Sequence, residues 1–118
     1  MDWTIEDDTS VDLDLERIAE HLRASYLAFG DGPHEAAEKA LGRVRGIRER
    51  RRALARTPHI GTRHDADLPG LRHVTMGRAV YWFVLDEPAR TVRLVGVFYG
   101  GQDHFSRIMD RVTGEGPG

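Results

Sequence analysis

The sequence predicts an α+β domain: a short N-terminal strand, an antiparallel helical hairpin packed on a three- to four-stranded antiparallel sheet, and a short C-terminal helix. Two observations predict this architecture. The last third of the chain holds three apolar runs joined by two short links, which is typical of a meander of strands. The first half holds two stretches with apolar residues at helical spacing, separated by a four-residue break that contains two glycines and a proline.

The N-terminal part is expected to form a strand and then a helix. Residues 3–5 alternate between apolar and polar side chains, as in a strand that joins a sheet. Residues 7–10 supply several candidate N-caps for the helix that follows. One stripe of this helix is expected to face the core, and it comprises Leu15, Ile18, Ala19, Leu22, Tyr26 and Phe29.

A second helix is expected from about residue 34 to residue 56. Gly30 is expected to end the first helix in the left-handed conformation, and Pro33 suits the first turn of the second. Pro58 stops the second helix, because proline disfavours helical geometry in the residue before it. The buried stripe of this helix is expected to comprise Ala36, Ala37, Ala40, Leu41, Val44, Ile47 and Leu54.

The meander is expected to contain three strands, because its apolar runs are rich in β-branched and aromatic residues. These strands are predicted at residues 71–76, 79–85 and 91–99. Gly77 and Arg78 form a two-residue turn signal between the first two strands. A polar loop at residues 59–69 is expected to lead the chain from the second helix into this sheet.

The C-terminal residues predict a short helix and a tail. Asp103 is a candidate N-cap, and the apolar side of the helix comprises Phe105, Ile108, Met109 and Val112. The domain is therefore expected to span residues 1–112. The Gly- and Pro-containing residues 113–118 are expected to be a disordered tail.

Composition excludes several classes of protein. With 118 residues, 40% of them hydrophobic, the chain is long enough to bury a core as one domain. There is no cysteine, which excludes disulfides and thiolate metal sites. No apolar run approaches the roughly 20 residues that span a bilayer. The acidic N-terminus lacks the basic start of a signal peptide, so a cytoplasmic protein without membrane contact is expected.

The net charge of −2 hides an uneven distribution. Acidic residues crowd the first 20 positions, whereas the middle of the chain is rich in arginine. Such a basic region favours phosphate, a nucleic-acid-bearing machine or an acidic partner segment, although a solvated helix face is the simpler alternative. The arginines concerned are Arg43, Arg45, Arg48, Arg50, Arg51, Arg52, Arg56, Arg63, Arg72 and Arg78.

Several local strings follow one another in an order that resembles a known family. Residues 3–6 lead into an acidic helix start at residues 12–18, and Ala36-Ala37 opens a long second helix. Pro58-His59-Ile60-Gly61 leads through a polar loop to Gly70-Leu71-Arg72. Residues 95–103, Val-Gly-Val-Phe-Tyr-Gly-Gly-Gln-Asp, are the clearest part. Together these strings resemble the RelE/ParE superfamily, the toxins of bacterial type II toxin–antitoxin modules, including plasmid stabilisation toxins.

The resemblance implies a cytoplasmic growth inhibitor that is neutralised in a hetero-oligomer with a cognate antitoxin protein. In the ParE branch the target is DNA gyrase and the toxin is not an enzyme. In the RelE branch the toxin cuts mRNA on the ribosome, and neither branch needs a cofactor or metal. The ParE-like branch is favoured, because Lys39 is the only lysine whereas ribosome-dependent members carry a lysine-rich surface. A toxin fold that has lost its toxicity is a third hypothesis.

A RelE-like ribonuclease would need a phosphate clamp and an acid–base pair. The resemblance assigns these roles to Arg72 on the first meander strand and to Tyr99 and His104, which flank the turn after the last strand. Simpler alternatives remain open for each residue. Arg72 can pair with a nearby carboxylate (Asp65, Asp67 or Asp103), Tyr99 can pack in the sheet, and His104 can sit in the first turn of a helix.

Two further sets of residues are predicted for binding. The ParE-like hypothesis assigns contact with the target, or the geometry of that site, to Arg72, Arg78, Asp103, Arg107 and Arg111. The basic surface of the helical hairpin is expected to bind an acidic antitoxin segment through Arg45, Arg48, Arg51 and Arg52. No metal site is predicted, because His59, His64 and His73 fit no helix-borne ligand spacing.

Overall fold

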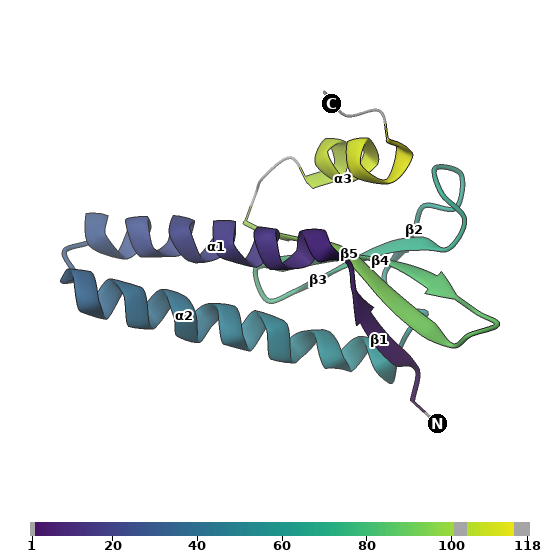
Figure 1. Cartoon of the computed structure of the whole chain (residues 1–118), viewed down its shortest axis with the longest axis horizontal. Coiled ribbons are helices and arrows are strands. Elements are labelled where there is room, and N and C mark those ends of the chain that lie inside the picture. Colours follow the sequence, from purple (N-terminus) through teal and green to yellow (C-terminus); the bar gives the residue numbers. More distant parts are fainter. Residues whose placement is uncertain (1, 101–103, 115–118) are drawn as a thin grey trace.

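The computed structural model describes residues 2–100 and 104–114, and it confirms the predicted α+β class. Figure 1 shows a long helical hairpin, a sheet and a short C-terminal helix. The elements follow in the order β1 (Thr4–Asp7), α1 (Thr9–Ala28), α2 (Pro33–Arg50), the 3₁₀ helix η1 (Arg51–Ala55), β2 (Thr62–Arg63), β3 (Leu71–Met76), β4 (Ala79–Asp86), β5 (Thr91–Tyr99) and α3 (His104–Thr113).

The sheet has five strands in the order β1-β5-β4-β3-β2. β1 runs parallel to β5, whereas the other pairs are antiparallel. The sheet is therefore mixed and has one strand more than expected. The extra strand is β2, whose two residues pair with Arg72 and His73 of β3 inside the predicted polar loop.

The helical hairpin follows the predicted sequence signals closely. Gly30 has φ +102 and ends α1, and Pro33 is the first residue of α2. The second helix does not continue to residue 56 as one α-helix, because its last turns tighten into η1, as helix ends often do. Figure 1 shows that the loop end of the hairpin projects beyond the sheet.

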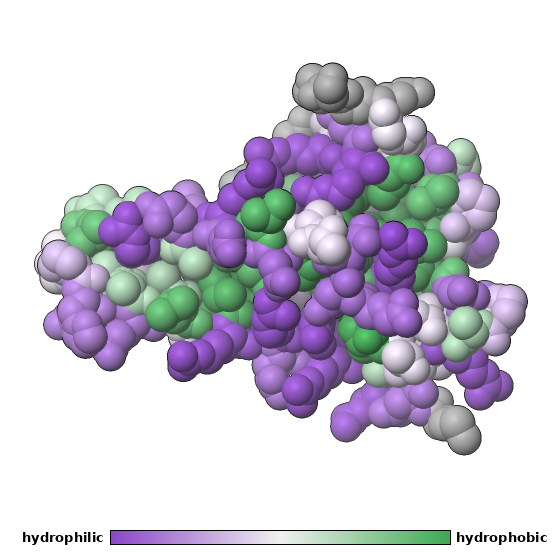
Figure 2. All heavy atoms as spheres, viewed as in Figure 1, coloured by the Kyte–Doolittle hydropathy of each residue, from purple (hydrophilic) through white to green (hydrophobic). Residues whose placement is uncertain are grey.

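The core between hairpin and sheet contains most of the predicted helix stripes. Phe29 and Leu41 were predicted to be buried there but are 88% and 53% exposed. Phe29 caps the projecting end of α1, and Leu41 lies about 100° around α2 from the buried Ala40. Figure 2 shows apolar surface gathered over this projecting end. The buried members of this core include Val11, Leu15, Ile18, Leu22, Ala40, Ile47, Tyr81, Phe83 and Leu94.

A second, smaller core lies on the opposite face of the sheet, under α3. Successive side chains of a strand point to opposite faces, so Val80 and Trp82 face α3 whereas Tyr81 and Phe83 face the hairpin. Ile108 anchors α3 in this core and is fully buried. The sheet is thus covered by the hairpin on one face and by α3 on the other.

A buried ion pair joins α1 to α3. Asp14 is 2% exposed, and its carboxylate accepts two hydrogen bonds from the Arg111 guanidinium, at 2.8 and 3.0 Å. The same carboxylate accepts a bond from the Val97 backbone N–H at 3.0 Å, and Arg111 also donates to the Val95 carbonyl. This pair therefore ties both helices to the central strand β5.

Candidate functional site

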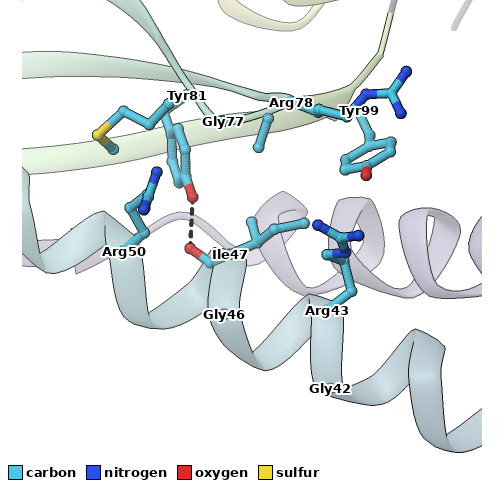
Figure 3. Close-up of a pocket in the computed structure, with 11 residues that line it drawn as sticks. Gly42, Arg43, Gly46, Ile47, Arg50, Gly77, Arg78, Tyr81 and Tyr99 are labelled. Atoms are coloured by element: carbon cyan, nitrogen blue, oxygen red, sulfur yellow. Dashed lines mark hydrogen bonds between the residues drawn. The ribbon is translucent and has the colours of Figure 1, made fainter.

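An open cavity of 610 Å³ lies between α2 and the turn that joins β3 to β4 (Figure 3). A neighbouring cavity of 640 Å³ shares three of its lining residues, Arg43, Arg78 and Tyr99, and extends past Tyr26 to Phe29 at the projecting end of the hairpin. The first cavity is lined by Gly42, Arg43, Gly46, Ile47, Arg50, Met76, Gly77, Arg78, Ala79, Tyr81 and Tyr99.

Helix α2 forms one wall of this cavity. Arg43 and Arg50 are seven residues apart, which places them on the same side of the helix and about 10 Å apart along its axis. Gly42 and Gly46 lie beside them, and a Cβ added at either glycine would meet no atom within 4 Å. The helix surface between the two arginines is therefore low and open.

The sheet forms the opposite wall. Gly77 turns the chain with φ +66, a conformation that favours glycine, and it sets Arg78 at the cavity edge. The Arg78 guanidinium lies 5.9 Å from the centre of the Tyr99 ring, within the range of a cation–π contact. Tyr99 itself is 8% exposed. The structure thus brings together two residues that the sequence analysis predicted for the site.

Tyr81 connects the two walls. Its buried hydroxyl donates a hydrogen bond of 2.7 Å to the Ile47 carbonyl of α2, as the dashed line in Figure 3 marks. Burial of the phenol raises the pKa of Tyr81 to about 12, although the charges of Arg50 and Arg51 act in the opposite direction. Tyr81 is therefore a neutral hydrogen-bond donor at neutral pH.

Replacing Tyr81 with phenylalanine is expected to change how stability depends on pH. In the wild-type protein the folded phenol stays neutral to a pKa of about 12, whereas the unfolded phenol ionises near 10. The contribution of Tyr81 to stability is therefore fully present below pH 10 and is lost between pH 10 and 12. Tyr81→Phe removes the hydrogen bond and is expected to lower the free energy of unfolding by about 1 kcal/mol at pH 7. Because the variant has no phenol at position 81, its stability should fall less than that of the wild type between pH 10 and 12. Urea unfolding at pH 7, 10 and 11.5 measures both effects, and parallel alkaline slopes would contradict the assignment.

The described lining of the cavity is basic. Arg43, Arg50 and Arg78 form no ion pair with any residue in ranges 2–100 and 104–114. No aspartate, glutamate or histidine is among the described residues that line it. The neighbouring basic residues of the hairpin differ, because Arg48 donates to Asp12 at 2.7 Å and Arg51 lies 3.2 Å from Asp7.

Arg72 lies apart from this cavity. It pairs with Phe83 on β4, four residues along that strand from Ala79, which pairs with Tyr99. Four strand residues correspond to about 13 Å. The Arg72 guanidinium donates a 2.7 Å hydrogen bond to the His59 carbonyl.

Of the carboxylates predicted to pair with Arg72, the structure describes Asp65 and Asp67, and neither forms an ion pair with it. Asp65 accepts hydrogen bonds from the Gly70 N–H and from Arg63, and these contacts, with the Arg72 charge contributing least, lower the pKa of Asp65. No ion pair joins Arg72 to Asp67 either among the described contacts. Arg72 therefore fixes the polar loop through a backbone carbonyl.

His104 lies on the opposite face of the sheet from the Tyr99 ring. Its Nδ1 accepts a 3.0 Å hydrogen bond from the Trp82 indole, and its ring centre is 5.6 Å from that of His73. His73 in turn hydrogen-bonds to His64, with 2.7 Å between ring nitrogens. Burial, and then the charges of His64 and His104, lower the pKa of His73. The structure does not unite Arg72, Tyr99 and His104 in one site.

The remaining predicted target contacts fall elsewhere. Arg111 is committed to the buried pair with Asp14 and keeps only 24% of its side chain exposed. Arg107 is exposed on α3 beside a small cavity of 30 Å³. Asp103 and residues 115–118 of the predicted tail lie outside the described residues, and α3 ends at Thr113.

The described part of the chain shows neither a metal-binding cluster nor a membrane-spanning helix. Within it, no group of three or more histidine and carboxylate side chains is arranged to hold a metal ion. None of its helices combines the length and the apolar character that crossing a membrane requires.

The sequence analysis did not assign Arg43, Arg50 and Tyr81 to a site. A signal for the first two was present, since two arginines seven residues apart lie beside two glycines, Gly42 and Gly46, inside a predicted helix. Glycine in a helix interior lowers stability relative to alanine by about 1 kcal/mol, so such a pattern indicates a surface kept open. No local signal marked Tyr81, because its role depends on contact with the distant Ile47.

The fold and the cavity define a class of α+β protein in which a helical hairpin and a mixed sheet enclose a basic groove. No protein-family model matches the sequence, and no curated protein is similar to it. Among solved structures, the chain is similar to the chromosomal ParDE TA system from P. aeruginosa, with a TM-score of 0.60 and 19% identity over 83% of this chain and 96% of that one.

Two further solved structures are similar at lower TM-scores. The toxin–antitoxin complex RelBE2 from Mycobacterium tuberculosis has a TM-score of 0.49 and 18% identity, over 84% of this chain and 99% of that one. The isolated E. coli RelE toxin has a TM-score of 0.48 and 9% identity, over 93% of this chain and 98% of that one. The match to the ParDE structure shows that the chain shares the fold of that structure, as the resemblance in the sequence implies.

Proposed function

We propose that the chain is the toxin of a type II toxin–antitoxin module and that it arrests growth by binding its target, DNA gyrase, without cutting nucleic acid. The observation that carries this proposal is the cavity lined by Arg43, Arg50 and Arg78. General acid–base catalysis works best with a group that titrates near neutral pH. The described lining offers arginines, Tyr99 and Tyr81, whose pKa is about 12, but no histidine or carboxylate, which favours binding over proton transfer. Similarity to the ParDE structure supports this branch.

An antitoxin partner forms part of the proposal, because the structure with the same fold is a ParDE TA system. The hairpin is the proposed surface for it, and the apolar Phe29 and Leu41 are exposed there. Among the four predicted arginines, Arg45 forms no ion pair with a described residue, whereas the other three pair with acids of this chain. An acidic antitoxin segment would therefore compete with those acids for Arg48, Arg51 and Arg52.

One observation favours a second candidate, a RelE-like ribonuclease. His64, His73 and His104 lie in contact on the α3 face, and imidazoles are the side chains best suited to acid–base work at neutral pH. In this hypothesis His104 would act through Nε2, since Nδ1 already accepts the Trp82 bond.

Inducing the chain without an antitoxin tests the two candidates. We expect growth arrest, filamentation and a DNA damage response with mRNA intact, and we expect His104→Ala to arrest growth as strongly as the wild type at equal soluble levels. Sequencing of RNA ends and a reporter for DNA damage provide the readouts. Rapid mRNA cleavage that His104→Ala abolishes would establish the ribonuclease instead. Normal growth with abundant folded protein would mean that toxicity has been lost.

A further inference from the structure

We propose that His64, His73 and His104 hold α3 on the sheet only while their imidazoles are neutral, and that protonation of these three rings, the imidazole cluster, releases the helix. The cluster lies on the face of the sheet that α3 covers, opposite the hairpin. No described residue of α3 lines the arginine cavity, so the inference does not depend on the identity of the target.

The imidazole cluster joins three parts of the chain around one buried indole. His64 follows β2, His73 lies on β3, and His104 is the first residue of α3. The centres of the His64 and His73 rings are 4.9 Å apart and lie 4.8 and 4.6 Å from that of Trp82. The His104 ring lies 5.6 Å from that of His73 and 5.7 Å from that of Trp82. The start of α3 therefore packs against rings that can each take up a proton.

The hydrogen bonds of the cluster require unprotonated nitrogens. His104 Nδ1 accepts the 3.0 Å bond from the Trp82 indole, and a proton on Nδ1 would set two donors against each other. The 2.7 Å bond between His64 Nε2 and His73 Nδ1 needs one nitrogen as acceptor, so it is lost when both rings are charged. The bond that ties α3 to Trp82 therefore exists only with a neutral His104.

The surroundings of the cluster oppose positive charge. Burial, and then the charges of His64 and His104, lower the pKa of His73. His104 begins α3, where the helix dipole disfavours a cation. No described carboxylate forms an ion pair with any of the three rings. Protons taken up here are therefore not offset by a counter-charge.

The charged side chains on the neighbouring elements are engaged elsewhere or stand apart from the cluster. In the loop before β3, Asp65 accepts a 2.7 Å bond from Arg63, and Asp14 of α1 is paired with Arg111 of α3. β4 and β5 face the cluster with uncharged rings. The other charged residues of β2 to β5, the loop and α3 form no described ion pair with a cluster ring, and they are Asp67, Arg72, Arg78, Asp86, Glu87, Arg90, Arg93, Arg107 and Asp110.

The direction of the pH effect follows from the lowered pKa of His73. A histidine whose pKa is lower in the docked state than its ordinary value of about 6.5 stabilises docking fully above that pH and loses this contribution as the pH falls. One proton taken up on release changes the docking equilibrium by up to tenfold per pH unit. His73 alone therefore weakens docking by up to about thirtyfold between pH 6.5 and 5.0.

Amide hydrogen exchange read by mass spectrometry tests the proposal on the purified chain, with EDTA present to exclude metal binding. Protection factors are corrected for the intrinsic exchange rate and compared at pH 7.5 and 5.0. We expect the protection of α3 to fall roughly tenfold to thirtyfold at pH 5.0 and to recover at pH 7.5, while that of α1 stays nearly constant. Ile108→Ala removes a buried anchor of α3 but no imidazole, so it should lower α3 protection at both pH values.

A variant without titrating rings separates the cluster from other effects of acid. The triple variant His64→Gln, His73→Gln and His104→Asn keeps hydrogen-bonding groups, and the asparagine oxygen can accept the Trp82 bond in place of Nδ1. Its α3 protection should be the same at both pH values. His73→Gln alone should remove most of the response. His34→Gln is the matched control, because the His34 side chain is 87% exposed on α2, and it should keep the full response.

The outcomes separate acid release of α3 from general acid unfolding. A fall confined to α3 that the triple variant or His73→Gln suppresses supports the proposal. Equal loss of protection in α1 and α3, or a full response in both His73→Gln and the triple variant, would overturn it. So would α3 protection in the wild type that is already as low at pH 7.5 as in Ile108→Ala.

Discussion

Replacing Asp14 with alanine is expected to lower the free energy of unfolding by roughly 3 to 5 kcal/mol. The carboxylate is almost fully buried and accepts bonds from Arg111 and from the Val97 N–H. Its loss leaves a partly buried guanidinium without its counter-charge and a backbone donor of β5 without an acceptor. The result expected in urea unfolding is a lower midpoint with an unchanged m-value.

Asp12 offers a control two residues earlier in the same helix. It pairs with Arg48 at the surface, where its side chain is 73% exposed, so Asp12→Ala should have little measurable effect. A double variant, Asp14→Leu with Arg111→Met, removes both charges and should recover much of the loss, because the desolvation cost disappears with the pair. If Asp14→Ala and Asp12→Ala proved equally mild, the buried pair would not stabilise the fold as described.

Trp82→Ala is expected to cost about 3 to 5 kcal/mol, since a fully buried indole would leave a large void beneath α3. Trp82→Phe keeps most of the volume but leaves the His104 Nδ1 without its donor, so a smaller loss of about 1 to 2 kcal/mol is expected. Urea unfolding monitored by far-UV circular dichroism compares the two variants.

Trp3 is the matched control for this series, because it lies at the margin of the other core and is half-buried. Trp3→Ala should cost about 1 to 2 kcal/mol. Backbone amide exchange adds a spatial readout, because Trp82→Ala should raise exchange in α3 more than in α1. Equal exchange in the two helices would show that Trp82 does not hold α3 in place.

Local signals predict most of the fold. The three meander strands follow from β-branched and aromatic runs with short links, and β3 and β5 have the predicted limits. The hairpin follows from Gly30 and Pro33, whose backbone preferences act over a few residues. β2 gives no such signal, because two polar residues become a strand only through pairing with β3.

The site is less predictable because its parts meet only in three dimensions. Asp14 looks like an ordinary acidic residue near a helix start, and its burial depends on Arg111, 97 residues further along the chain. The predicted Arg78 and Tyr99 do share a cavity, yet Arg43 and Arg50 complete it from a helix whose arginines look alike in the sequence. Strand order also separates Arg72 from Tyr99, and side-chain alternation places Trp82 and its partner His104 on the other face.

The parallel pairing of β1 with β5 has a consequence for the newly synthesised chain. Of the described elements β1 is made first, but its partner β5 is the last strand made of the described sheet. Between Ala55 and Tyr99 the chain gains 44 residues (99 − 55), which takes roughly 2 to 9 seconds at about 5 to 20 residues per second. During that interval the apolar stripe of the hairpin is exposed and open to a partner, while the cavity, whose wall includes Tyr99, does not yet exist. The order of synthesis thus makes the hairpin accessible before the cavity forms.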